Sequence, residues 1–259
     1  MRAAEVVARH VEKLILEGAL RPGDRLAAER EIAAELQVSR PSVRDGLKLL
    51  QEKGLVVAQP GGGTVVARLG GEITDPLVAL LLSGEGVIDN YLEFRTLLEG
   101  AAARLAAERA NRIDLEMLGA CIERIDRAHE LGDVAEEAEA DLELHVVIYE
   151  ATHNVVLLHV MRALSTLLRS DVFQNRERLY ARPKVRELLR EQHRAIHAAI
   201  VAGDGAAAAE AAQAHLGFVR QAAQEIQAAN EQLEVSLRRL EGGKIGVRPA
   251  PATARTGGR

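Results

Sequence analysis

The chain has 259 residues, which is enough for two modest domains with buried cores. Hydrophobic residues make up 47% of it and aromatic residues only 2%, so the core must be built from Ala, Leu, Val and Ile, mostly in helices. One cysteine, Cys121, excludes an internal disulfide framework, and no apolar stretch is long enough to span a membrane. We therefore expect a soluble, cytoplasmic protein with no membrane partner.

The charge is unevenly distributed along the chain. The net charge is −5, yet residues 1–70 carry 11 Lys and Arg against 9 Asp and Glu, which leaves 22 and 29 for the remainder. The negative charge thus lies outside the first segment. The net charge of +2 for residues 1–70 is by itself weak support for DNA binding, because affinity depends on where the cationic side chains lie.

The first seventy residues predict three helices and a β-hairpin. Apolar spacing indicates helices over 4–17 and 28–36, and Ser39 is a good N-cap for a third helix that runs to about Lys53. Two short β-type runs, 55–58 and 64–67, then flank a Gln-Pro-Gly-Gly-Gly turn. This order is that of a winged helix-turn-helix.

The rest of the chain shows only helical patterns. The fold class is therefore mainly α, with a C-terminal all-α antiparallel bundle behind the winged head. The predicted helices are 75–83, 88–109, 112–131, 133–151, 155–172, 183–202 and 205–240. The predicted organisation is a DNA-binding domain over 1–69, a linker and connecting helix over 70–84, an all-helical metal- and effector-binding domain over 85–240, and a disordered tail over 241–259.

The third helix carries a basic stripe. Val43, Leu47 and Leu50 share one face and should be buried, while Arg40, Arg44 and Lys48 fall at i, i+4 and i+8 on another, with Ser42 close by. A helix in the major groove of double-stranded DNA uses such a row, because Arg can fork to guanine or clamp phosphates. A solvated helix face is the alternative, but the order of elements favours DNA. Arg30 should reach the sugar-phosphate backbone of the DNA, and Gly61 should let the wing approach that backbone closely.

Several spaced motifs in this segment resemble the N-terminal domain of the GntR family of bacterial repressors. They are the segments 20–26, 29–31 and 38–44, followed by Leu47, Gly54-Leu55 and Gly63-Thr64. The resemblance covers about residues 5–67. It implies DNA contacts at Arg30, Arg40, Ser42 and Arg44 and a wing near Gly61, and Ala27 stands where the family usually has proline.

Four residues of the second domain form a candidate metal site. Asp141 and His145 are one helical turn apart, and His193 and His215 lie in two helices joined by a turn at Gly203-Asp204. Three imidazoles and a carboxylate suit Zn²⁺ or another divalent transition metal. Spacing alone leaves open that these are ordinary surface or hydrogen-bonded histidines, or that His197 or His153 takes part instead.

Residues 88–235 resemble the FCD effector domain of the FadR subgroup of GntR regulators. The matching pieces are 94–99, 141–145, Asn154, 192–196, Gly203-Asp204 and His215-Leu216. The resemblance implies metal ligation by Asp141, His145, His193 and His215, with Gln192 in place of the usual Glu. It implies effector-binding roles for Arg95, which could pair with an effector carboxylate, and for Asn154, near the metal. An Arg95–Glu99 pair along the helix is the alternative for Arg95, and a helix stop is the alternative for Asn154.

These features predict a ligand-responsive transcription regulator and not an enzyme. We expect a homodimer that binds a palindromic operator, acting as a repressor, with a small organic acid that completes the coordination of the metal and re-orients the two heads. The metal is expected to be zinc, with nickel or manganese as alternatives. A metal sensor is the first alternative function. A metal-dependent hydrolase fused to a DNA-binding module is the second, although Glu143 should point away from Asp141 and His145.

Overall fold

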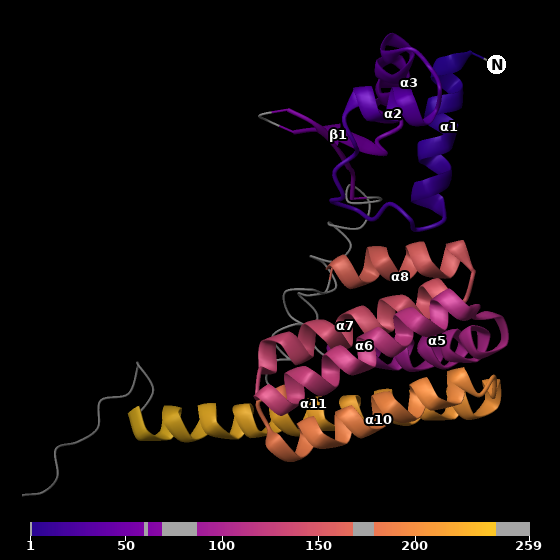
Figure 1. Ribbon diagram of the computed structural model, residues 1–259. Helices are drawn as coiled ribbons and strands as arrows, with labels where there is room; N and C mark the ends of the chain where they lie inside the picture. Colours follow the sequence, from indigo (N-terminus) through magenta and orange to yellow (C-terminus); the bar gives the residue numbers. More distant parts are fainter. Residues whose placement is uncertain (1, 60–61, 69–86, 168–178, 242–259) are drawn as a thin grey trace, which may run out of the picture.

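The computed structural model describes residues 2–59, 62–68, 87–167 and 179–241, and Figure 1 shows their arrangement. An N-terminal head of short helices and a hairpin lies next to a stack of longer helices. Each part has hydrophobic clusters of its own: one lies within residues 7–66, and the other two lie within residues 102–226. Within the described residues, no helix is long and apolar enough to cross a membrane.

The head is built from α1 (Ala3–Leu16), α2 (Glu29–Glu35) and α3 (Arg40–Glu52). Ser39 caps α3 as expected, because its Oγ accepts a hydrogen bond from the backbone N–H of Ser42 at 3.3 Å. The α3 face made by Val43, Leu47 and Leu50 is buried against α1. Gly46 lies on the same face, and a Cβ there would come within 2.8 Å of the backbone oxygen of Ala4. Glycine therefore allows α1 and α3 to pack this closely.

The wing is an antiparallel hairpin of β1 (Val56–Ala58) and β2 (Thr64–Val66), with Val57 opposite Val65. Its turn includes Gly62 and Gly63, both with positive φ, and Arg25 donates a hydrogen bond to the carbonyl oxygen of Gly62 at 3.0 Å. The expected hairpin and the winged-helix order are confirmed. Gly61 lies outside the described residues.

The helical part consists of packed, mostly long helices, whose core is rich in alanine as the composition requires. Asn111 caps the start of α6 (Arg112–Leu131) through its side-chain oxygen, and Gly132 ends that helix in the left-handed conformation, so the helix covers the predicted span of 112–131. The predicted helix at 75–83, the end of the one at 155–172 and the tail lie outside the described residues. The helices are α5 (Val87–Arg109), α6 (Arg112–Leu131), α7 (Val134–Ala151), α8 (Val155–Leu167), α10 (Pro183–Val201) and α11 (Gly205–Glu241). The mainly α fold class, with a winged head and a helical C-terminal domain, is confirmed.

Candidate metal centre and DNA-binding face

Two of the four predicted ligands come from α7. Asp133 caps this helix, accepting a hydrogen bond from the backbone N–H of Glu136. Asp141 and His145 follow one turn apart, so both side chains leave the same face of the helix. The Oδ1 atom of Asp141 lies 3.2 Å from Nε2 of His145.

The other two ligands come from α10 and α11, which form a helical hairpin. The helices are joined through Gly203, whose positive φ of 70° allows the tight turn, and they pack along each other. This brings the rings of His193 and His215 to a centroid separation of 4.6 Å, although the residues are 22 positions apart in the chain. The His145 ring lies 5.7 Å from that of His193 and 5.4 Å from that of His215.

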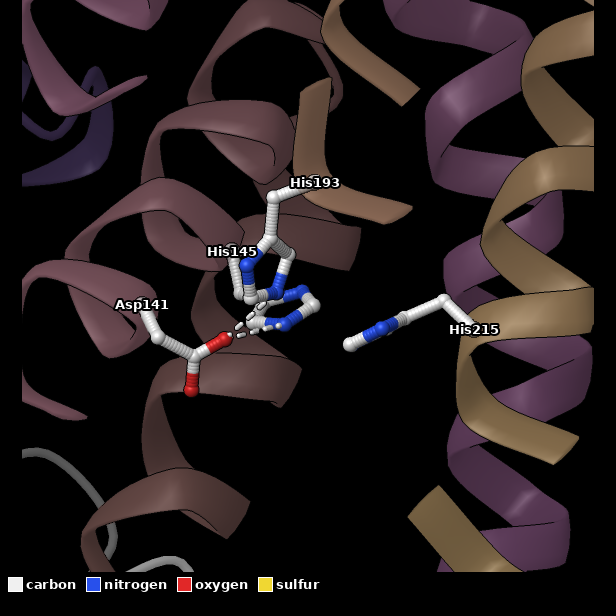
Figure 2. Close-up of side chains that lie close together, drawn as sticks. All are labelled: Asp141, His145, His193 and His215. Carbon is white, nitrogen blue, oxygen red and sulfur yellow. Dashed lines mark ion pairs between the residues drawn. The ribbon is translucent and has the colours of Figure 1, made fainter. Parts of the chain in front are cut away.

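Figure 2 shows that the four side chains converge on one point between the helices. One potential ligand atom from each residue lies within 4.8 Å of those of the other three, and all four residues are buried. Nε2 of His145 and Nε2 of His193 both lie close to Oδ1 of Asp141, at 3.2 Å and 2.8 Å, whereas Nδ1 of His193 is buried without a hydrogen bond to any residue that the structure describes. Such an atom is costly to bury unless something binds it. A divalent metal ion fits this donor set, because imidazole nitrogens and a carboxylate oxygen are its common protein ligands.

Two further side chains contact Nδ1 of the His145 and His215 rings. Oε2 of Glu99, on α5, lies 2.6 Å from Nδ1 of His145, and Oε1 of Gln192, on α10, lies 3.0 Å from Nδ1 of His215. Each oxygen can accept a hydrogen bond from the Nδ1–H, which leaves Nε2 as the nitrogen with a free lone pair. Such partners orient metal-binding histidines and raise their basicity. The sequence does not indicate these roles of Glu99 and Gln192, because each depends on a contact between two helices.

Buried charges surround the His145 ring. Burial alone would raise the pKa of Glu99. The positive charge of Arg95, together with the charge of His145 and its hydrogen bond to Glu99, instead holds that pKa well below its usual range. Burial would lower the pKa of His145, but the negative charges of Glu99 and Asp141 outweigh it and raise that pKa. The pKa of His215 falls well below its usual value because of its burial and the nearby His193 and His145. His215 is therefore neutral, as a metal ligand must be.

The predicted effector residues make other contacts in this structure. Arg95 is buried and forms an ion pair with Glu99 at 2.6 Å, which is the alternative that the i, i+4 spacing offered. Asn154 caps α8, since its Oδ1 accepts hydrogen bonds from the backbone N–H groups of Val156 and Leu157. Their roles toward an effector stay predictions.

The two competing histidines lie outside the cluster. His153, in the turn between α7 and α8, contacts Asp114 at 2.8 Å. His197, one turn after His193, is half-buried and is not among the four residues whose donor atoms meet.

The predicted DNA-binding side chains gather on the solvent side of α2 and α3. Arg30, Arg40, Arg44 and Lys48 are exposed, and Ser42 is half-buried in the first turn of α3. Arg44 is held by a two-pronged ion pair, with its Nη2 and Nε at 2.9 Å and 3.2 Å from the two carboxylate oxygens of Glu29. This hydrogen-bonded pair lowers the pKa of Glu29. The basic stripe is therefore on the surface, and one of its members is already paired within the head.

Both parts of the chain, the winged head and the helical domain, match known families. Residues 3–66 match the family described as "Bacterial regulatory proteins, gntR family", and residues 90–218 match the FCD domain. The chain belongs to the GntR family of transcription regulators, in the subgroup that carries an FCD domain. Its relatives are regulators and not enzymes.

Three similar proteins illustrate this membership. A protein of Escherichia coli strain K12 named as a regulator of the L-lactate dehydrogenase operon is 38% identical over 84% of this chain and 85% of its own length. The Glc operon transcriptional activator of the same strain is 33% identical over 83% of this chain and 87% of its own. The HTH-type transcriptional regulator LutR of Bacillus subtilis strain 168 is 35% identical over 78% of this chain and 93% of its own.

Proposed function

We propose that this protein is a ligand-responsive transcription regulator whose helical domain binds a divalent metal ion together with a small carboxylate effector. The observation that carries the proposal is the cluster of Asp141, His145, His193 and His215. Their potential ligand atoms all lie within 4.8 Å of one another, and Nδ1 of His193 is buried without a hydrogen bond within the described residues. Membership of the GntR family supports the link between such a site and DNA binding.

The proposed operator contacts are Arg30, Arg40, Ser42, Arg44, Lys48 and Gly61. The exposure of the four cations and the position of α3 in a winged fold support this set, apart from Gly61. We propose that the protein binds a palindromic operator as a homodimer, so that the two α3 helices read equivalent half-sites. Repression is our first hypothesis for the outcome of binding, although one relative is named as an activator.

The proposed ligands of the metal are Asp141, His145, His193 and His215, with Zn²⁺ as the first candidate and Ni²⁺ or Mn²⁺ as alternatives. Three nitrogens and one oxygen suit Zn²⁺ well, and all three metals accept imidazole. When bound, the ion would supply a positive charge and open coordination positions for a carboxylate oxygen. In the protein, Glu99 and Gln192 would keep the His145 and His215 rings in the orientation that such binding needs.

The proposed effector is a small carboxylic acid, and the name of the L-lactate dehydrogenase operon regulator makes L-lactate the first compound to test. Its binding would act on the DNA-bound state only through a difference in affinity between two orientations of the heads. A metal sensor, in which the ion itself is the signal, is the second candidate, since the same buried donor set would serve it.

Metal analysis tests the site. Elemental analysis by inductively coupled plasma mass spectrometry should find about one divalent ion per chain in the purified wild-type protein. The variants His193→Ala and His215→Ala should each lose this ion. His197→Ala is the matched control, because it removes a histidine one turn from His193 that lies outside the cluster. Undiminished metal in both ligand variants would contradict the proposal.

DNA selection tests the head. Wild-type protein should enrich a palindrome from random duplexes, and Arg44→Ala should weaken binding to it by about 1–3 kcal/mol and relax the preference at one position per half-site. Arg112→Ala removes an equally exposed cation from α6 and should change neither. Titrating the operator complex with metal, and then with L-lactate at fixed metal concentration, distinguishes a regulator that responds to a carboxylate from one that responds to the metal ion itself.

A further inference from the structure

The metal-site helix α7 carries functional groups on two opposite faces. Asp141 and His145 point into the helical domain, toward α10 and α11. Glu143 and Glu150 are seven residues apart and so share a face, which lies about half a turn of the helix away from Asp141 and His145. The prediction that Glu143 points away from the ligands agrees with its partner, which belongs to the head.

That partner is Arg21, in the loop between α1 and α2. Its Nη1 lies 2.7 Å from Oε1 of Glu143, and its Nη2 lies 2.9 Å and 3.1 Å from the two carboxylate oxygens of Glu150. The backbone N–H of Arg21 also donates to Asp24 at 2.7 Å, which fixes the loop that carries it. One guanidinium thus joins two carboxylates of α7 to the DNA-binding head.

The bridge is partly buried and balanced in charge. Glu150 also accepts a hydrogen bond from Arg162, on α8, so two arginines face two glutamates. The exposed fraction of the side chain is 36% for Arg21, 17% for Glu150 and 10% for Arg162. Glu143 is 35% exposed, so the cluster is shielded from water mainly at Glu150 and Arg162, where its ion pairs are screened less than ordinary surface pairs.

Two neighbouring contacts hold the same loop against α8. Gly18 has a φ of +82°, and a Cβ at this position would come within 2.9 Å of Cδ2 of Leu158 and 3.1 Å of Arg162. Nε2 of His159 lies 2.9 Å from the backbone oxygen of Leu16 and can donate a hydrogen bond to it. The end of α1 and the following loop are thus seated on the helical domain by several independent contacts (Figure 1).

We propose that Arg21 fastens the DNA-binding head to the back of the metal-site helix, so that a displacement of α7 at its ligand face is passed directly to the head. The docking rests on the contacts above, and the transmission rests on the proposed function of the metal site. A single rigid helix joins the two faces, so no longer chain of residues is needed between them. Loss of Arg21 should uncouple the head without disturbing the metal ligands.

The docking is tested by amide hydrogen exchange on the full chain as purified. In Arg21→Ala, the amides of residues 16–26 should exchange at least several times faster than in the wild type, while those of α7 keep their rates. Arg124→Ala is the matched control: it removes an ion pair to Glu136 of similar exposure, but one that lies within the helical domain. Arg21→Glu combined with Glu143→Arg should restore part of the protection. Unchanged exchange at 16–26 in Arg21→Ala would overturn the proposal that Arg21 fastens the head.

The transmission is tested with zinc alone as the probe. Adding Zn²⁺ to chelator-treated wild-type protein should change the exchange of residues 16–26 by a factor of two or more, and the change should vanish in Arg21→Ala, with equal zinc content in both. An equal response in the two proteins, or none in zinc-loaded wild type, would overturn the transmission. Failure of the wild type to bind zinc or any other divalent ion would instead contradict the proposed function, and the docking would still be judged by the first comparison.

Discussion

Oε1 of Gln192 lies 3.0 Å from Nδ1 of His215, so a neutral amide holds the ring of a proposed metal ligand. The amide oxygen can only accept from the ring, which places the proton on Nδ1 and leaves the Nε2 lone pair for a metal. A carboxylate at the same position would do this more strongly, because its negative charge raises the basicity of the imidazole.

We therefore expect opposite effects from two substitutions of Gln192. Gln192→Leu should weaken metal binding by about 10- to 100-fold, because the ring loses its partner. Gln192→Glu should bind metal at least as tightly as the wild type. Competition with a chelating indicator measures both affinities, and circular dichroism checks that the helices are intact. Equal affinity in Gln192→Leu and the wild type would contradict a positioning role for this residue.

Breaking the buried ion pair of Arg95 and Glu99 should destabilise the protein strongly, whereas replacing both residues by apolar ones should destabilise it much less. Glu99→Gln leaves the Arg95 charge buried without its carboxylate and should lower the free energy of unfolding by about 3–5 kcal/mol. The double variant Arg95→Met with Glu99→Leu should regain much of this loss, since a well-packed apolar pair avoids the desolvation penalty.

Urea denaturation of the metal-free proteins measures these differences. The double variant should nevertheless bind metal more weakly than the wild type, because it also lacks the acceptor for Nδ1 of His145. A double variant no more stable than Glu99→Gln would contradict this account.

The stabilisation given by metal should grow with pH. The pKa of His145 is raised in the metal-free fold, so its interactions with Glu99 and Asp141 contribute fully below about pH 6.5 and are lost as the pH rises through the folded pKa. Metal binding needs the deprotonated ring, and its affinity should rise about tenfold per pH unit while His145 is protonated. The melting-temperature difference between zinc-loaded and chelator-treated protein should therefore be larger at pH 8 than at pH 6. His197→Ala should show the same profile, and a difference that does not depend on pH would contradict the prediction.

The ion pair between Arg44 and Glu29 should restrain DNA binding. Both the pair and the added negative charge oppose contact of Arg44 with DNA, so Glu29→Gln should tighten operator binding. Because an exposed ion pair contributes little, the expected gain in affinity is small, between about 1.4-fold and about fivefold. Fluorescence anisotropy with a labelled operator at fixed salt measures the change. Glu12→Gln is the control, because Glu12 makes a similar exposed pair with Lys53 on another side of the head; an equal gain there would indicate only a general effect of charge.

The sequence predicts local features well and distant partners poorly. The boundaries of α6 follow from Asn111 and Gly132, because capping residues act within a few positions of themselves. The pairing of Arg95 with Glu99 could be foreseen from its i, i+4 spacing. The contact of Glu99 with His145 could not, since it depends on how α5 packs against α7. Arg21 and Glu143 are 122 positions apart, and nothing in the pattern around either residue indicates the other.

Gly46 allows a last prediction, about the packing of α3 against α1. A Cβ there would come within 2.8 Å of both the backbone oxygen of Ala4 and Cβ of Val7, and neither atom can move without displacing α1. Gly46→Ala should therefore lower the free energy of unfolding by about 1–3 kcal/mol, despite the better helix propensity of alanine. Gly119→Ala, in the middle of α6, meets only one atom at 3.9 Å and should be neutral or stabilising by up to about 1 kcal/mol. Urea denaturation distinguishes the two, and equal stability of both variants would mean that α1 and α3 can separate at little cost.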